Sequence, residues 1–243
     1  HTFAKFGQPM PNLRLTAHNN IPHSRGMGSS GAAVVSGIIA AKGLLTGIVE
    51  ISSQQLLELA TELEGHPDNV APALFGGLTI AWEDETGPHH KKLFVHRGVS
   101  PLELIPTTKM STSLARSLQP ESVPHDDAVF NVSRSALLIA ALTQSPELLL
   151  AATEDRLHQD YRASAMPETE AMVATMREAG HAAVVSGAGP SVLVLSSDPG
   201  QRIQAAKLAA EKFPQWRALL LAVDFKGATV VLHQDSNAGN GGH

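Results

Sequence analysis

The chain has 243 residues, with 18 Lys and Arg against 23 Asp and Glu, so its net charge is −5 with histidine neutral. Hydrophobic residues make up 43% and charged residues 17%, which is ordinary for a soluble globular protein of one large or two small domains. The mild acidity argues against nucleic acid as a main partner, because phosphate backbones need a basic surface. The absence of cysteine excludes disulfides, thiolate nucleophiles and iron–sulfur clusters.

Taken in chain order, the first half predicts few strands. Residues 12–18 alternate apolar and polar side chains, which favours a strand. A turn-rich segment follows, and the run 32–45 predicts a buried helix that is too short and too interrupted to span a membrane. Ser52 is a candidate cap for the next helix, which ends at Gly65. A short helix, a glycine turn and a strand over 78–82 complete this half.

The second half mixes strands and helices without a regular alternation, which favours an α+β fold over a doubly wound sheet. Strands are expected over 93–96, 102–106, 182–186, 191–196, 218–223 and 228–233, and helices over 111–118, 126–143, 146–158, 167–179 and 200–213. The polar stretch 83–101 is the best boundary between domains. We therefore expect an N-terminal domain over 1–99, a C-terminal domain over 100–234 and a disordered tail over 235–243.

The strongest local signal is the run Pro-His-Ser-Arg-Gly-Met-Gly-Ser-Ser-Gly-Ala-Ala over residues 22–33. Glycines let the backbone turn sharply, so that several N–H groups can point at one anion. The alanine-rich helix that follows directs the positive end of its dipole to the same place. Ser29 and Ser30 add hydroxyls for phosphate oxygens or Mg²⁺. This run therefore predicts a phosphate-binding loop.

Several kinds of loop share these features. Gly26, Gly28 and Gly31 satisfy the short dinucleotide fingerprint, with Glu50 at a suitable distance for a ribose, but a polar turn precedes them instead of a tight strand-to-helix turn. A P-loop is rejected because Ala32 and the alanine after it stand where Lys and Ser or Thr are required. An ordinary loop with a helix cap is the plainest alternative. The remaining match is the ATP loop of the GHMP kinases.

Three further segments extend that match. The run over 62–77 contains Glu-Leu-Glu-Gly-His-Pro-Asp-Asn-Val-Ala-Pro, residues 186–191 read Ser-Gly-Ala-Gly-Pro-Ser, and 157–162 read Leu-His-Gln-Asp-Tyr-Arg. With these blocks, residues 10–233 resemble the homoserine kinases of the GHMP superfamily. The His-x-Asp-Asn-Val-Ala-Pro block is the part typical of homoserine kinases, whereas the two glycine-rich loops indicate the superfamily.

The resemblance implies a two-domain α+β fold, S5-like at the N-terminus and ferredoxin-like at the C-terminus. It implies transfer of a phosphoryl group from ATP to the hydroxyl of L-homoserine, on the route to threonine, with Mg²⁺. Catalytic roles are expected for Ser30, Glu64 and Asn69; Mg²⁺ would be held by Ser30 and Glu64, with Glu62 as second choice and Glu58 selected by a count without gaps. ATP would lie on Pro22, His23, Ser24, Arg25, Gly26, Met27, Gly28, Ser29, Ser30 and Gly31.

The residues that the resemblance implies for homoserine are His66, Asn69, Thr112, Arg116, Arg162, Gly187 and Gly189. An amino-acid substrate carries a carboxylate, which an arginine fork binds through two charge-assisted hydrogen bonds. Relatives in the superfamily have an Asp that acts as the general base for the substrate hydroxyl. At the matching position this chain has Asn69, and the neighbouring Asp68 is expected to point elsewhere. We therefore expect direct attack by a positioned hydroxyl that loses its proton late.

The first superfamily motif is absent before residue 22, and the chain begins with His. We therefore expect a fragment that is weakly active or inactive alone. The alternatives are a GHMP kinase for another small alcohol such as mevalonate, and a non-catalytic binding protein of the same fold. A cytoplasmic protein is expected, without nucleic-acid or membrane partners, and a homodimer is compatible with the resemblance.

Overall fold

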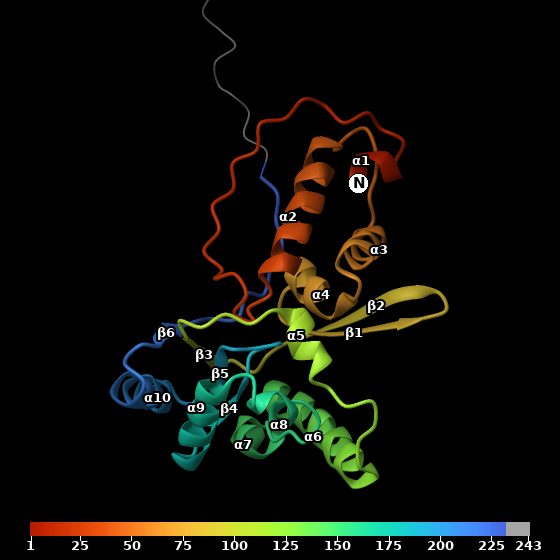
Figure 1. Cartoon of the computed structure of the whole chain (residues 1–243). Helices are drawn as coiled ribbons and strands as arrows, with labels where there is room; N and C mark the ends of the chain where they lie inside the picture. The colour runs from red at the N-terminus through yellow and green to blue at the C-terminus, as the bar shows by residue number, and fades with distance from the viewer. Residues whose placement is uncertain (232–243) are drawn as a thin grey trace, which may run out of the picture. The chain divides into compact units, whose positions relative to one another are not determined.

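The computed structural model describes residues 1–231, except for the side chains of Thr112, Ser113 and Arg116. The chain forms two compact units (Figure 1). Among the described residues, the first unit comprises His1–Thr16, Gly31–Lys91 and residues 225–231, and the second comprises Ala17–Ser30 and Lys92–Asp224. This grouping places the segment 17–30 with the C-terminal part of the chain. The expected boundary between residues 99 and 100 stays a prediction, and the expected tail 235–243 lies outside the described residues.

The first unit is built mainly from helices. They are α1 (Thr2–Lys5), α2 (Ser29–Leu44), α3 (Ser53–Glu64) and α4 (Pro67–Phe75). The predicted cap is confirmed: the Ser52 hydroxyl accepts from the Gln55 N–H, and the Gln55 side chain accepts from the Ser52 N–H. Gly65 ends α3 in the left-handed conformation, with φ of 92°. Pro67 then starts α4, where its missing N–H costs nothing.

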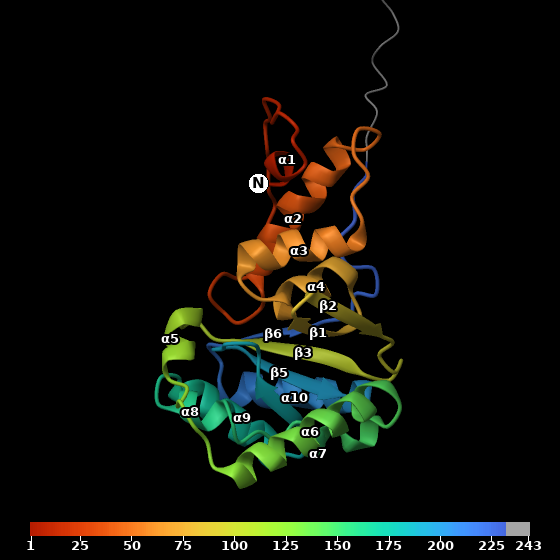
Figure 2. The ribbon, with the colours of Figure 1, turned by 90° about the vertical axis from the view of Figure 1, so that its right-hand side faces the viewer.

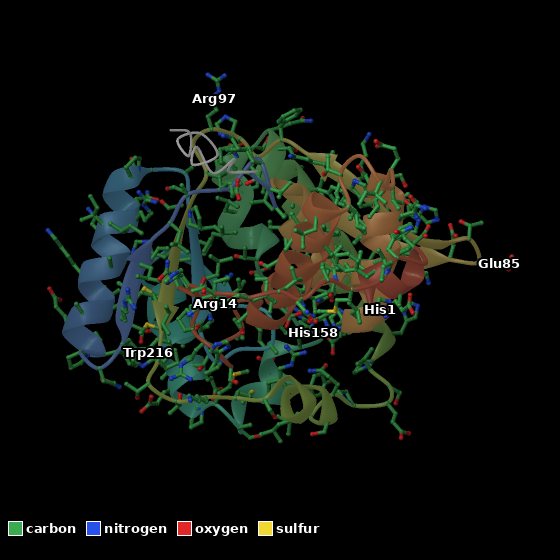
Figure 3. The ribbon with its side chains drawn as sticks, turned by 90° about the horizontal axis from the view of Figure 1, so that it is seen from above. His1, Arg14, Glu85, Arg97, His158 and Trp216 are labelled. Atoms are coloured by element: carbon green, nitrogen blue, oxygen red, sulfur yellow. The ribbon has the colours of Figure 1, made fainter. Side chains whose placement is uncertain are left out.

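A two-stranded sheet completes the first unit, with β1 (Leu78–Asp84) and β2 (Gly87–Leu93) joined by a tight turn. Glu85 lies at the tip of this hairpin (Figure 3). The core of the unit joins Ile38 of α2, Leu57 of α3 and Val70 of α4, all of which are buried. Packing of these apolar faces, more than helix propensity, stabilises such short helices.

The second unit is an antiparallel four-stranded sheet in the order β4-β5-β3-β6. The strands are β3 (Ser100–Ile105), β4 (Ala182–Val185), β5 (Val192–Ser196) and β6 (Arg217–Leu220). Leu102 of β3 lies opposite Val194 of β5 and Leu220 of β6, which sets the register. With α9 between β3 and β4 and α10 between β5 and β6, the chain follows the β-α-β-β-α-β order of a ferredoxin-like fold. The expected α+β class is confirmed.

The second unit also contains helices. They are α5 (Thr112–Ser117), α6 (His125–Thr143), the 3₁₀ turn η1 (Pro146–Leu148), α7 (Leu149–Ala152), α8 (Gln159–Ala163), α9 (Pro167–Glu178) and α10 (Pro199–Lys212). Figure 2 shows α9 and α10 against one face of the sheet, where Met172 and Ala205 meet Leu104 in a buried core. None of the helices in residues 1–231 combines the length and the apolar character that a membrane crossing requires.

Some expected elements are wrong. Residues 12–18 form no strand, because alternation alone supplies no partner strand to take up the backbone hydrogen bonds. The strand expected over 93–96 lies earlier: β2 covers Gly87–Leu93, within the polar stretch expected to be the domain boundary. The helix expected over 146–158 is divided into η1 and α7 and ends at Ala152. Residues 228–231 carry no strand, although the Ala228 N–H donates to the Ala73 carbonyl at 3.0 Å.

Candidate functional site

The first glycine-rich loop, residues 22–31, turns by left-handed backbone conformations. Ser24, Gly26 and Gly28 have φ of 56°, 77° and 72°. A Cβ makes this left-handed conformation sterically unfavourable, so it is unfavourable for the serine and not for the glycines. Gly28 and Ser30 are exposed, whereas Gly31 is buried at the start of α2. The bend and the open start of a 16-residue helix therefore present backbone to solvent, as an anion-binding loop requires.

A second glycine-rich loop, residues 186–191 between β4 and β5, packs directly on the first. A Cβ at Gly26 would overlap the Ser186 carbonyl and come within 2.8 Å of the Gly189 nitrogen. A Cβ at Gly187 would lie 2.6 Å from the Gly26 carbonyl. The Ser191 N–H donates to the Arg25 carbonyl at 3.3 Å, and the Ser186 hydroxyl donates to the Gly26 carbonyl at 3.4 Å. Residues 22–30 of the first loop and the whole second loop belong to the second unit, and this contact needs glycine on both sides.

The Arg25 side chain lies toward the segment that follows β3. Its Nε donates to the Pro106 carbonyl at 3.0 Å and its Nη2 to the Thr107 carbonyl at 2.6 Å, while Nη1 is buried without a hydrogen-bond partner in the structure. The Ser24 carbonyl accepts from the Met110 N–H at 3.2 Å. Arg25 therefore anchors the first loop to the sheet of the second unit.

Arg162 lies on α8, beside the second loop. Its Nη1 donates to the Gly187 carbonyl at 3.3 Å. When the amide of Gln119 is oriented by its partners, its oxygen accepts from Arg162 Nε at 2.9 Å and its nitrogen donates to the Leu157 carbonyl at 2.9 Å. The structure thus brings Arg162, Gly187 and Gly189 together with the first loop, and their predicted roles remain predictions.

The start of α8 is fixed by Asp155. Its carboxylate accepts from the backbone N–H groups of His158 and Gln159 at 2.9 and 2.7 Å, and from the Asn131 side chain at 2.7 Å. His158, which precedes α8, is labelled in Figure 3. Burial alone would raise the pKa of Asp155, but the hydrogen bonds from His158, Gln159 and Asn131 outweigh it and hold the pKa below its ordinary value. Asp155 therefore stays charged and fixes the helix that carries Arg162.

The remaining predicted residues lie on the first unit, at the start of α4. His66 is its N-cap residue, and its Nδ1 contacts the Asp68 carboxylate. Asn69 lies in the first turn of α4, and a Cβ on Gly31 would contact the Asn69 Cβ at 3.4 Å. Gly31 at the start of α2 and Asn69 are therefore neighbours, and the predicted roles of His66 and Asn69 remain predictions.

Three glutamates on α3 are candidates for binding Mg²⁺, and the structure shows that their surroundings differ. Glu62 is exposed and accepts from Lys5 Nζ at 2.9 Å, with His1 Nε2 at 3.4 Å. The exposed Glu58 accepts from the Gln54 side chain at 3.1 Å. Glu64, in the last turn of α3, is half-buried. The side chains of Thr112 and Arg116 lie outside the described residues, so their predicted roles remain predictions.

Sequence reasoning missed a buried acid beneath the second loop. Glu103, in the middle of β3, is 3% exposed, and its Oε1 has no hydrogen-bond partner in the structure. Burial raises the pKa of Glu103 to about 7, although a hydrogen bond from the Ser186 side chain opposes the rise. The signal in the sequence was an acidic residue at the centre of an otherwise apolar strand.

Comparison with known proteins agrees with this geometry. Residues 1–77 match the model of the GHMP kinases N-terminal domain, and residues 136–215 match that of the GHMP kinases C-terminal domain. The two glycine-rich loops and the ferredoxin-like sheet are thus those of a GHMP-type kinase, for which ATP is the phosphoryl donor.

Similar proteins narrow the class. The chain is 73% identical over 239 residues to a homoserine kinase of Clavibacter michiganensis subsp. michiganensis, with 98% of this chain and 76% of the relative covered. It is 68% identical to a homoserine kinase of Leifsonia xyli subsp. xyli, covering 99% of this chain and 75% of that relative. A crystal structure of a homoserine kinase from Cytophaga hutchinsonii aligns with a TM-score of 0.77 and 25% identity, over 86% of this chain and 69% of that one. The chain belongs to the homoserine kinase family.

Proposed function

We propose that the chain transfers the γ-phosphoryl group of ATP to the side-chain hydroxyl of L-homoserine, giving O-phospho-L-homoserine and ADP. The observation that carries this proposal is the 73% identity to a curated homoserine kinase over nearly the whole chain. The packing of Gly26 on the second loop supports it, because it holds a loop of the right chemistry in an anion-binding shape. The product places the reaction on the route to threonine.

The nucleotide is proposed to lie on the first loop. The left-handed conformations of Gly26 and Gly28 turn the backbone toward solvent, and α2 begins directly after them. Backbone N–H groups and the helix dipole together stabilise phosphate charge at such a helix start. Arg25 is proposed to act by anchoring the loop, since its guanidinium lies on the carbonyls of Pro106 and Thr107.

Mg²⁺ is proposed to be held by Ser30 and Glu64 together with phosphate oxygens of ATP. A hydroxyl and a carboxylate are hard oxygen ligands, and Mg²⁺ in kinases is usually held by one or two such groups and the substrate phosphates. Glu62 is a weaker candidate because Lys5 already occupies its carboxylate. When bound, the ion would offset charge on the transferred phosphoryl group.

Homoserine is proposed to bind through Arg162 at its carboxylate, with His66 and Asn69 on the first unit and Thr112 and Arg116 on α5. Arg162 is suited to this role because Gln119 and the Gly187 carbonyl fix the plane of its guanidinium. A planar fork held in one orientation loses little entropy when it binds a carboxylate through two hydrogen bonds.

Phosphoryl transfer depends mainly on positioning and on neutralising charge. Asn69 cannot accept a proton usefully, and the Asp68 carboxylate contacts His66. We therefore propose that the homoserine hydroxyl attacks without a carboxylate base. Asp68→Asn is expected to retain turnover, measured as O-phosphohomoserine formed per minute. Lost turnover with both substrates still bound would contradict this mechanism.

The experiment that tests the function compares acceptors. The chain is incubated with MgATP and homoserine, mevalonate or no acceptor, and ADP release is measured. The ratio between acceptors decides the function, whatever the absolute rate. A marked excess with homoserine supports the proposal. Equal release with all three, or an excess with mevalonate, overturns it.

A further inference from the structure

The second glycine-rich loop needs external support to keep one shape. Only four residues, Ser186 to Gly189, separate Val185 at the end of β4 from Pro190. Gly187 and Gly189 adopt left-handed conformations, with φ of 54° and 83°. Glycine loses more conformational freedom on ordering than any other residue, so a loop of this composition is not rigid by itself.

Two side chains from neighbouring helices hold the ends of this loop. At its start, Gln159 Oε1 of α8 accepts from the Val185 N–H at 2.8 Å. Val185 belongs to β4, the edge strand of the sheet, so this N–H has no further strand to bond. At its end, the Thr169 hydroxyl of α9 donates to the Pro190 carbonyl at 2.7 Å, and Thr169 is only 2% exposed.

The fixed ends lead directly to the first loop. Ser191, next to Pro190, donates its N–H to the Arg25 carbonyl, and Ser186, next to Val185, carries the carbonyl on which Gly26 packs. Any displacement of the second loop therefore moves the backbone of Arg25 and Gly26. A binding loop that is ordered before its ligand arrives loses less entropy on binding and binds more tightly.

We propose that Thr169 and Gln159 are positioning residues that hold the second loop and, through it, preorganise the first loop for ATP. This inference rests on the proposed function, because it assumes that the first loop binds the nucleotide. Gln159 shares α8 with Arg162, whose Nη1 reaches the Gly187 carbonyl, so the same short helix ties the proposed carboxylate site to the nucleotide loop. Thr169 and Gln159 act on the reaction through the loops.

The test uses a pair of substitutions at Thr169. Thr169→Val keeps the shape of the side chain and removes the donor to Pro190, whereas Thr169→Ser keeps the donor. Thr143→Val is the matched control, because the Thr143 hydroxyl makes a hydrogen bond of the same length, 2.7 Å, to the Ile139 carbonyl of α6 in the same unit. Two quantities are measured: the Kd of MgATP by calorimetry, and hydrogen exchange of the amides of residues 186–189.

Thr169→Val is expected to weaken MgATP binding about tenfold and to speed exchange of the loop amides by a similar factor. Thr169→Ser and Thr143→Val are expected to stay within about twofold of the parent chain. Faster exchange without weaker ATP binding would overturn the inference, because the residue would then be merely structural. Unchanged exchange would overturn it as well.

Gln159→Met is the second variant, and it guards against a loss of folding at Thr169. Gln159 and Thr169 line one cavity of about 300 Å³, so the substituted side chain has room. Because both residues act on one loop, Gln159→Met and Thr169→Val are expected to be non-additive in ATP affinity. Fully additive effects on ATP affinity would contradict the inference that both residues act through the same loop. The ATP-binding measurements need no homoserine, so the effect of the loop can be measured whether or not the proposed function holds. ADP release by the parent chain that does not depend on homoserine would contradict the proposed function alone.

Discussion

The two glycine-rich loops of this chain use the same residue types for different physical ends. The first, residues 22–31, leads into a long helix and leaves Gly28 and Ser30 exposed. The second, residues 186–191, joins two strands, and side chains at both ends hold it. In the first loop Gly28 leaves the backbone exposed, whereas Gly26 packs on the second loop. Glycine in the second serves to let two backbones approach, so that the second loop supports the first.

The contact between the two loops is expected to be the most sensitive point of the molecule. Gly26→Ala places a Cβ against the Ser186 carbonyl and the Gly189 nitrogen, neither of which can move as a side chain end could. We expect kcat/KM to fall by about a hundredfold or more. The measurement is steady-state kinetics with MgATP and homoserine.

The control for this change is Gly180→Ala. Gly180 has a similar left-handed φ of 85°, but nothing lies within 4 Å of the position that a Cβ would take there. This variant reports the conformational cost alone, and its kcat/KM should remain near that of the parent chain. Equal losses in both variants would show that backbone strain, and not the contact between the loops, is decisive.

A substitution of Arg162 distinguishes two roles of this side chain: support of the second loop and the proposed binding of the substrate. Arg162→Lys keeps the charge but removes the planar fork that Gln119 and Gly187 orient. We expect the KM for homoserine to rise by about ten- to a hundredfold, and the KM for ATP to rise much less. A larger effect on ATP than on homoserine would assign Arg162 to the loop instead of the substrate.

Glu103 tests how much the burial of a carboxyl group under the second loop costs in stability. Its pKa is raised from 4.5 to about 7 by burial. Between these two pH values the folded chain binds a proton that the unfolded chain has released, so the free energy of unfolding falls as the pH rises. From pH 4.5 to pH 8, this effect lowers the free energy of unfolding of the parent chain by about 3 kcal/mol at most. Glu103→Gln should abolish this fall, so the variant should gain stability relative to the parent as the pH rises. Urea unfolding at both pH values measures it, and an unchanged pH dependence would contradict the raised pKa.

The smallest effect is expected at the cap of α3. Ser52→Ala removes the cap of α3 and should lower the free energy of unfolding by about 1 kcal/mol. Since the hydrogen bonds of the Ser52 cap lie within the first turn of α3, kcat/KM should stay unchanged, which sets the baseline for the other variants. A drop in kcat/KM as large as that of Gly26→Ala would show that any loss of stability lowers activity.

The elements that the sequence predicted correctly are those with local signals. The capping residues Ser52 and Gly65 fixed the ends of α3, and the glycine pattern located both loops. The strand expected over 12–18 was wrong, because a strand depends on a partner that a local pattern does not contain. The roles of Thr169 and Gln159 could not be predicted either. Their hydrogen bonds join residues 21 and 26 positions apart, and only the folded chain brings them to the loop.

The candidate site residues were identified mainly through resemblance, and their roles remain proposals. His66, Asn69 and Arg162 are ordinary as single residues, and their meaning came from the blocks that contain them. What no block indicated is the geometry that fixes them, such as the Asp155 carboxylate at the start of α8 or the orientation of Arg162 by Gln119. Such supporting contacts depend on packing between helices and cannot be read from spacing along the chain.

The most direct measurement of the central claim is acceptor-dependent ADP release by the 243-residue chain with MgATP, with O-phosphohomoserine identified by mass spectrometry. The account predicts that homoserine raises ADP release above the rate without acceptor, in step with O-phosphohomoserine and whatever the absolute rate, and that mevalonate does not. ADP release that ignores homoserine, or that follows mevalonate instead, would contradict it.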